Sequence, residues 1–262
     1  MPSFYPTRLK AALAAASLAV LLGAGAIPVS ADSFTPEQKR DLGGIIKDYL
    51  ISHPEVLRDA ITALDAHEKA AESEERTKAL ATLAGPLATA PDGFVIGNPD
   101  GKITLVEFFD YNCGYCRRSL PDIAHLMKDN ADLKVVLRDF PILSPSSVDA
   151  AIIAGAAHRQ LTGDKFWEFH KTLLSSHGVV GKEQALAVAK DMGADMDKLA
   201  RDTADPTIRT AIQGSDSFAK TLNLNGTPSF VIGDDVQIGA VGYDQLQAEI
   251  TNIRKCGKAL CS

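Results

Sequence analysis

The spacing of hydrophobic residues divides the chain into a helical N-terminal region and a later region of mixed strands and helices. Between residues 34 and about 85, apolar residues such as Leu42 and Ile45 recur at helical spacing, which indicates amphipathic helices. Residues 103–109 are rich in β-branched and aromatic residues, which is typical of a buried strand. Helical spacing returns from residue 113 onwards, so a strand leads directly into a helix.

The region after residue 94 contains the strands of an α/β fold. The strand at 103–109, the helix after it and a second strand at 134–137 form a β-α-β unit, which implies a parallel strand pair and a right-handed crossover. The elements that follow are helices 150–160, 165–175, 183–191 and 207–222, strands 229–232 and 236–240, and helix 243–255. We therefore expect an α/β domain with a helical insertion at about residues 145–222.

The first 31 residues have the pattern of a secretory signal peptide. Arg8 and Lys10 precede an apolar run over residues 11–27, and small residues end the pattern at Ala31. The alternative is a retained membrane anchor, although the run is short for a spanning helix. Cleavage would remove two positive charges and move the formal net charge from −6 to −8, which disfavours binding to nucleic acid. We expect a periplasmic protein that does not insert into the membrane after cleavage and that works in an oxidising compartment.

Cys113 and Cys116 form a C-x-x-C pair at the junction between the strand and the next helix. In the first turn of a helix the two sulfurs can be bridged, and the positive end of the helix dipole stabilises the Cys113 thiolate, which predicts redox chemistry. One alternative is a structural disulfide, which would constrain the unfolded chain little across two residues. Another is a metal site: two thiolates alone can bind Cu(I), but the six histidines supply no familiar zinc pattern. We expect no metal and no other cofactor.

In the order and spacing of these motifs, residues 94–255 resemble the thioredoxin superfamily, and within it the exported DsbA-like branch with a helical insertion. The resemblance implies a thioredoxin fold in which the Thr227–Pro228 peptide bond is cis and faces the C-x-x-C pair. A proline there leaves no N–H, and the Thr227 backbone can pair with an extended substrate chain beside the sulfurs. The resemblance therefore assigns substrate binding to Thr227, Pro228 and Tyr115.

Three residues are expected to be catalytic, two from their positions and one from the resemblance. By its position at the helix start, Cys113 attacks substrate disulfides, and Cys116, one turn further in, resolves the mixed disulfide. Glu107, six residues before Cys113, matches the family's buried acid and would exchange a proton with Cys116. The alternative for Glu107 is an ordinary strand carboxylate that faces solvent, but an acid in an otherwise apolar strand is costly unless it is used or hydrated.

The residues around the cysteines bear on the direction of the chemistry. A histidine between the cysteines, as in the strongly oxidising DsbA, places positive charge near the thiolate, and Tyr115 cannot do so. The Gly114-Tyr115 pair and the threonine before Pro228 resemble the disulfide isomerases of the DsbC type. We therefore favour a disulfide isomerase, with a DsbA-like oxidase as the alternative. A copper-binding or holdase-type protein that uses the thiols as ligands is the alternative of another class.

The helical region before the α/β domain resembles the N-terminal stalk of the ScsC (suppressor of copper sensitivity) family, whose longer members trimerise through such helices. The stripes at residues 42–50 and 56–64 fit this, because a free two-helix hairpin could not bury them alone. The alternative is that these helices pack onto their own catalytic domain. Residues 65–78 are almost entirely charged or alanine, which indicates a solvated helix or a flexible connector. Gly85-Pro86 and the turn residues 90–93 mark a boundary after it.

These observations define a domain organisation and a set of partners. We expect a signal peptide over residues 1–31, a helical oligomerisation stalk and connector over 32–90, and a catalytic domain over 91–262. Cys256 and Cys261 are expected to form a structural disulfide that holds the C-terminus, with a second redox or metal pair as the alternative. The expected partners are exported cysteine-containing substrate proteins, a membrane-bound redox partner, and further copies of the chain in a homotrimer, with a dimer as the alternative.

Overall fold

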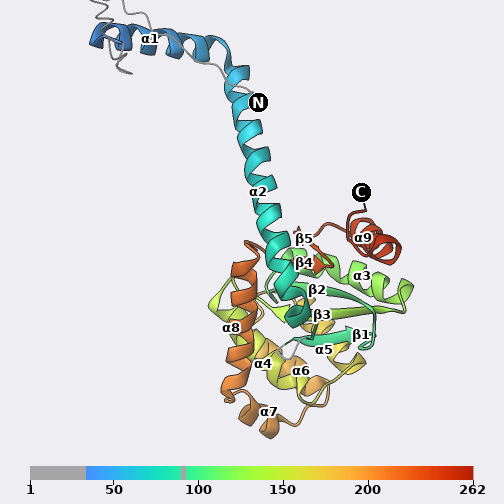
Figure 1. Ribbon diagram of the computed structural model, residues 1–262. Helices are drawn as coiled ribbons and strands as arrows, with labels where there is room; N and C mark the ends of the chain where they lie inside the picture. The colour runs from blue at the N-terminus through green and yellow to red at the C-terminus, as the bar shows by residue number, and fades with distance from the viewer. Residues whose placement is uncertain (1–33, 90–92, 262) are drawn as a thin grey trace, which may run out of the picture. The chain divides into compact units, whose positions relative to one another are not determined.

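The computed structural model describes residues 34–89 and 93–261, so the predicted signal peptide lies outside the described residues. Its elements are α1 (Pro36–Ser52), α2 (Pro54–Thr89), β1 (Phe94–Gly97), β2 (Ile103–Phe109), α3 (Gly114–Asp129), β3 (Leu133–Asp139), α4 (Pro145–His158), α5 (Asp164–Leu174), α6 (Lys182–Asp191), α7 (Met196–Asp202), α8 (Pro206–Thr221), β4 (Ser229–Ile232), β5 (Asp235–Ile238) and α9 (Tyr243–Cys256) (Figure 1). The described part of the chain contains no helix long and apolar enough to cross a membrane.

A five-stranded mixed sheet in the order β1-β3-β2-β4-β5 forms the centre of the α/β region. The β-α-β unit predicted from the sequence is confirmed: β2 and β3 are parallel and joined by α3, whereas β1, β4 and β5 pair antiparallel with their neighbours. This is the thioredoxin fold expected from the sequence, with α4–α8 as the helical insertion. β1 was not predicted, because a strand of four residues after a turn-rich segment carries little periodicity of its own.

Side chains of β2 alternate between two hydrophobic cores, one on each face of the sheet. Leu105 and Phe109 enter the larger core, which α3, α4, α5 and α9 cover. Val106 and Phe108 enter a smaller core on the opposite face, which contains residues of α8 and of the last turns of α2. Because β2 is buried on both faces, a polar side chain within it is held away from water.

The chain divides into two compact units between Ile61 and Thr62. In the first unit, α1 begins at the predicted position: Thr35 and Gln38 form a capping box, and Pro36 opens the helix. No residue of α1 is buried. The apolar stripe is exposed along α1 and the start of α2, and its members are Leu42, Ile45, Ile46, Tyr49, Leu57 and Ile61, together with Leu64 just inside the second unit.

The end of α2 belongs to the second unit, and the helix passes through Gly85-Pro86, the first of the two segments expected to mark a boundary. The helix continues through Pro86 to Thr89, and Leu80 and Leu87 are buried in the smaller core. Arg76 donates hydrogen bonds to the carbonyl oxygens of Leu222 and Asn223, at the C-terminal end of α8. Ala79 and Leu83 are partly buried against the same core. The functional division into a stalk through residue 90 and a catalytic domain stays a prediction.

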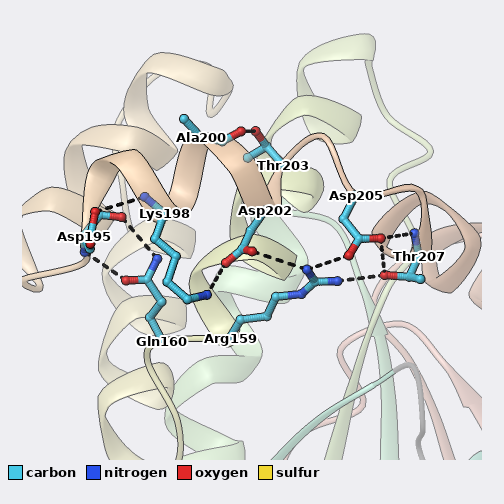
Figure 2. Close-up of polar contacts among 9 residues, drawn as sticks. All are labelled: Arg159, Gln160, Asp195, Lys198, Ala200, Asp202, Thr203, Asp205 and Thr207. Atoms are coloured by element: carbon cyan, nitrogen blue, oxygen red, sulfur yellow. Dashed lines mark hydrogen bonds and ion pairs between the residues drawn. The ribbon is translucent and has the colours of Figure 1, made fainter.

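A polar network joins three helices of the insertion (Figure 2). Arg159, which caps α4, donates to Asp205 at 2.8 Å and to the Thr207 hydroxyl at 2.7 Å, at the start of α8, and it forms an ion pair with Asp202 of α7 at 3.5 Å. Lys198 pairs with Asp202 from one turn earlier. Partly exposed ion pairs contribute little stability one by one, but a shared guanidinium fixes the relative positions of α4, α7 and α8.

Candidate active site

The C-x-x-C pair lies where β2 leads into α3. Cys113 is the N-cap of α3, with an extended backbone, and its sulfur accepts a hydrogen bond from the Cys116 N–H at 3.3 Å. The Cys113 N–H donates to the Asp110 carbonyl oxygen at 2.9 Å, and the Asp110 carboxylate accepts from the Asn112 N–H at 2.8 Å. The sulfur therefore stands where the first free N–H groups of a helix converge.

The two thiols have opposite acidities. Hydrogen bonds from the Cys116 thiol and from the backbone N–H groups of Cys116 and Tyr115 lower the pKa of Cys113 to about 6, against the penalty of burial. Burial raises the pKa of Cys116 far above that of a free thiol, and the hydrogen bond to Cys113 and the charge of Glu107 raise it further. At neutral pH, Cys113 is therefore mostly thiolate and Cys116 is a thiol.

Glu107 is buried in β2, with only 2% of its surface exposed. It is level with Leu137 of β3 and Phe230 of β4, so apolar strands flank it on both sides. Burial, and then the negative charge of Cys113, raise the pKa of Glu107 to about 8. A carboxyl group with this pKa can hold or release a proton near neutral pH, and it interacts electrostatically with both sulfurs.

The loop before β4 faces the cysteines. The Thr227–Pro228 peptide bond is cis, and the Thr227 carbonyl oxygen lies 3.1 Å from the Cys113 sulfur. Beside it, a hollow of about 290 Å³ is lined by Tyr115, Arg118, Gly226, Thr227, Ile238, Gly239 and Ala240. Tyr115 is 57% exposed, and the Arg118 guanidinium lies 4.6 Å from the centre of its ring. Tyr115 and Thr227, both predicted to bind substrate, thus line one surface next to Cys113.

Two residues hold the active-site loop against the insertion, and neither was predicted to do so. Asn112 donates from its amide to the Ser147 hydroxyl at 3.0 Å and to the Val180 carbonyl at 2.8 Å, and it accepts from the Val180 N–H at 2.8 Å. Arg117 donates to the carbonyl oxygens of Leu174 and Ser176 at the end of α5. All these partners lie at least 35 residues away in the sequence, so no local pattern could reveal them.

The two C-terminal cysteines lie in a separate disulfide. Cys256 and Cys261 are bonded, with their Cα atoms 6.1 Å apart. Gly257 takes a left-handed conformation, with φ of 77°, and ends α9, so that the tail can fold back. Ala259 is buried and donates its N–H to the Asp234 carboxylate at 2.8 Å. The geometry holds the C-terminal tail against the turn between β4 and β5.

A mixed sheet, a C-x-x-C pair at a helix N-terminus and a cis-proline opposite it define a thioredoxin-fold dithiol protein. Comparison with known families agrees: the family described as Thioredoxin matches residues 89–252, more than half of the chain, and the Copper resistance protein ScsC N-terminal domain matches residues 38–71. The chain belongs to the thioredoxin family, and within it to the thiol–disulfide oxidoreductases of the DsbA and ScsC type.

Solved structures of three related proteins are similar to this chain. A thioredoxin-like oxidoreductase from Silicibacter pomeroyi is 38% identical and covers 65% of this chain and 96% of its own, with a TM-score of 0.61. A linker-deletion mutant of Proteus mirabilis ScsC is 25% identical, and the match covers 86% of this chain and 99% of the mutant, with a TM-score of 0.63. The thiol-disulfide exchange protein alpha-DsbA2 from Wolbachia pipientis is 28% identical, and the match covers 70% of this chain and 98% of alpha-DsbA2, with a TM-score of 0.64.

Curated relatives include much longer proteins. The Na(+)/H(+) antiporter NhaA 1 of Salinispora arenicola is 28% identical over 160 residues, which is 60% of this chain. The match spans only 24% of that protein's length.

Proposed function

We propose that this protein is a periplasmic disulfide isomerase that acts on exported proteins through Cys113 and Cys116. The observation that carries the proposal is the pair of thiols with opposed acidities, a Cys113 thiolate with a pKa of about 6 beside a buried Cys116 thiol above Glu107. The thiolate attacks one sulfur of a substrate disulfide: a bond forms between Cys113 and that sulfur, and the other substrate sulfur leaves as a thiolate.

Two outcomes follow from this mixed disulfide. In isomerisation, the freed substrate thiolate attacks another disulfide, and a substrate thiolate finally displaces Cys113, with no net oxidation. In net reduction, Cys116 attacks the Cys113 sulfur, its proton passes to Glu107, and two electrons move from the dithiol to the substrate. A membrane-bound redox partner would then return the Cys113–Cys116 disulfide to the dithiol.

The neighbours of the sulfurs favour isomerisation over oxidation. Tyr115, between the cysteines, is exposed and carries no positive charge, so the thiolate depends on hydrogen bonds alone. The hollow beside Thr227 leaves room for an extended substrate chain next to Cys113, and Tyr115 supplies an aromatic surface for it. Thr227, Pro228 and Tyr115 therefore remain our proposed substrate-binding residues.

The exposed stripe on α1 and the start of α2 supports an oligomer, which we propose is a homotrimer. Ile45 is 66% exposed and Tyr49 52%, and no residue of α1 is buried. An isolated helix that buries nothing is marginal in water, so a second and third copy would supply the missing partner surface. Several active sites held around one substrate act at high effective concentration, which suits an isomerase.

Refolding of a scrambled multi-disulfide substrate tests the function. The mature protein should restore activity to the substrate, and Cys113→Ser should not, because the attacking sulfur is gone. Cys116→Ser should instead trap mixed disulfides with the substrate. Equal activity of Cys113→Ser and the wild type would refute the proposed chemistry.

Deletion of residues 32–71 tests the link between oligomer and isomerase. This deletion removes the exposed stripe but keeps Arg76, Leu80 and Leu87, which contact the second unit. Light scattering should show a trimer for the full mature chain and a monomer for the deletion. The monomer should keep dithiol oxidase activity and lose most isomerase activity. A full-length monomer with undiminished isomerase activity would show that the stalk does not serve this function.

A further inference from the structure

A cavity of about 260 Å³ lies in the helical insertion, apart from the residues of the redox site. It opens between α4 and α8, next to the start of β1 and the end of β3, and its principal lining residues are Phe94, Asp139, His158, Ile208, Ala211 and Ile212. The two helices are closely packed beside it, since a Cβ atom on Gly155 would lie only 2.8 Å from Cγ2 of Ile208. The cavity is therefore a shaped feature between tightly packed helices.

The rim of the cavity is held by the Arg159 network (Figure 2). The guanidinium group is occupied by Asp202, Asp205 and the Thr207 hydroxyl, so the positive charge of Arg159 is already balanced by two carboxylates. The network fixes the ends of α4 and α8 at the opening and supplies no net positive charge for a ligand.

Asp139 is the acid that faces the cavity. By the alternation along β3 its side chain lies on the same face of the sheet as Leu137, toward the insertion, and it is only 7% exposed. Among the described residues, its carboxyl group has no hydrogen-bond partner. The charge that acts on it is that of Asp110, whose own carboxylate accepts from the N–H groups of Asn112 and Leu143. An unpaired carboxyl beside a second negative charge favours a positively charged partner.

The other walls are apolar or aromatic. The rings of Phe94, His158 and Phe166 contact one another, with centroids 4.6–4.7 Å apart. Burial lowers the pKa of His158, so its imidazole is neutral at neutral pH. Ile208, Ala211 and Ile212 of α8 complete an apolar surface. Aromatic and aliphatic walls around a single acid suit an organic cation better than a hydrated metal ion.

We propose that this cavity binds a small alkylammonium ion, with the ammonium group on the Asp139 carboxylate and the alkyl chain against Ile208 and Ile212. The site is independent of the redox function proposed above. The other titratable groups near Asp139 are Asp110 and Tyr111 on the active-site loop, His158 at the end of α4 and Arg159, which caps it. His170 of α5 contacts the Tyr111 hydroxyl at 3.3 Å.

Binding is coupled to the release of a proton. Burial, and then the charge of Asp110, raise the pKa of Asp139 well above its ordinary value, so the free carboxyl group keeps its proton to higher pH than an exposed aspartic acid does. The bound ammonium ion stabilises the carboxylate, and the proton leaves to solvent. Affinity should therefore increase with pH, and protons should be released when the ligand binds.

Calorimetric titration of the full mature protein with n-butylammonium tests the site, with butyramide and butyrate as neutral and anionic probes of similar shape. Butylammonium should bind saturably in the millimolar range, as expected for so few atoms, with both comparison probes at least tenfold weaker. Titrations in two buffers of different ionisation enthalpy count the released protons. Equal binding of butyramide, tighter binding of butyrate, or no saturation would overturn the proposal.

Variants locate the binding. Asp139→Asn, which keeps the shape of the protonated acid, should weaken butylammonium binding at least tenfold and abolish the proton release. Asp191→Asn makes the same charge change at an exposed position of α6 and should leave the affinity unchanged. Ala211→Phe fills the cavity without touching the acid and should also weaken binding at least tenfold. Unchanged affinity in either cavity variant would refute the site, whereas the alkylation rate of Cys113 should be the same in all three.

Discussion

Replacement of Cys116 by alanine should raise the pKa of Cys113, because the Cys116 thiol donates the hydrogen bond that contributes most to the thiolate. A hydrogen bond to a charged group contributes about 1.5–3 kcal/mol, and 1.36 kcal/mol corresponds to one pH unit in pKa. The pKa of Cys113 should therefore rise from about 6 to about 7–8. It should stay below that of a free thiol, because the backbone N–H groups at the start of α3 remain. Cys116→Ser is the matched control, since its hydroxyl keeps a donor, and its pKa should stay near 6.

The assay is the rate of iodoacetamide alkylation of the reduced protein as a function of pH, with the modified cysteine identified by peptide mapping. The Cys256–Cys261 disulfide does not react, so in both variants Cys113 is the only free thiol among the described residues. The midpoint for Cys116→Ala should lie at least one pH unit above that for Cys116→Ser. Identical midpoints in the two variants would show that the side chain at position 116 does not lower the pKa of Cys113. The backbone N–H groups at the start of α3 would then account for the low pKa.

Two further predictions concern Glu107 and α2. The pKa of Glu107 is raised from 4.5 to about 8, so this carboxyl group destabilises the folded protein increasingly as pH rises through this range. Glu107→Gln should therefore stabilise the reduced protein by about 3 kcal/mol at pH 7 and by about 1 kcal/mol at pH 5. Urea unfolding at the two pH values checks this, and a gain independent of pH would contradict it. Leu80→Ala, at a residue 2% exposed, should lower the free energy of unfolding by about 2–5 kcal/mol without changing the oligomeric mass. Leu57→Ala, at an exposed residue of the stripe, should weaken the oligomer and leave the free energy of unfolding of the catalytic unit nearly unchanged. If Leu80→Ala weakened the oligomer and Leu57→Ala destabilised the catalytic unit, the start of α2 would not be the oligomer contact and its end would not belong to the catalytic unit.

The redox site was largely predictable because its first elements are local. The run at 103–109, the spacing of Cys113 and Cys116 and the helical pattern after them lie within about thirty residues, and the structure forms β2 and α3 there. Resemblance to a known family added what spacing alone could not: the position of the cis peptide at Thr227–Pro228.

The end of α2 illustrates what a local signal leaves open. Gly85-Pro86 indicates a helix boundary by its local preferences, yet the helix continues through it to Thr89. The smaller core buries Leu80 and Leu87 in these turns, and the contacts of a packed surface outweigh a local propensity of a few kcal/mol. The short helix α7 was not predicted separately, because seven residues form too few turns to show a periodic pattern.

By itself the sequence determined the order of the elements, the redox pair and its place at a helix start, because these depend on residues close together in the chain. Only the tertiary structure decided the acidity of Cys113, Cys116 and Glu107, because burial and the Thr227 loop, more than a hundred residues away, set the electrostatics. It also decided that Asn112 joins the active-site loop to the insertion. The acidities depend on low-dielectric surroundings, and the Asn112 contact depends on long-range hydrogen bonds. Both conditions exist only once the sheet and its helices have packed together.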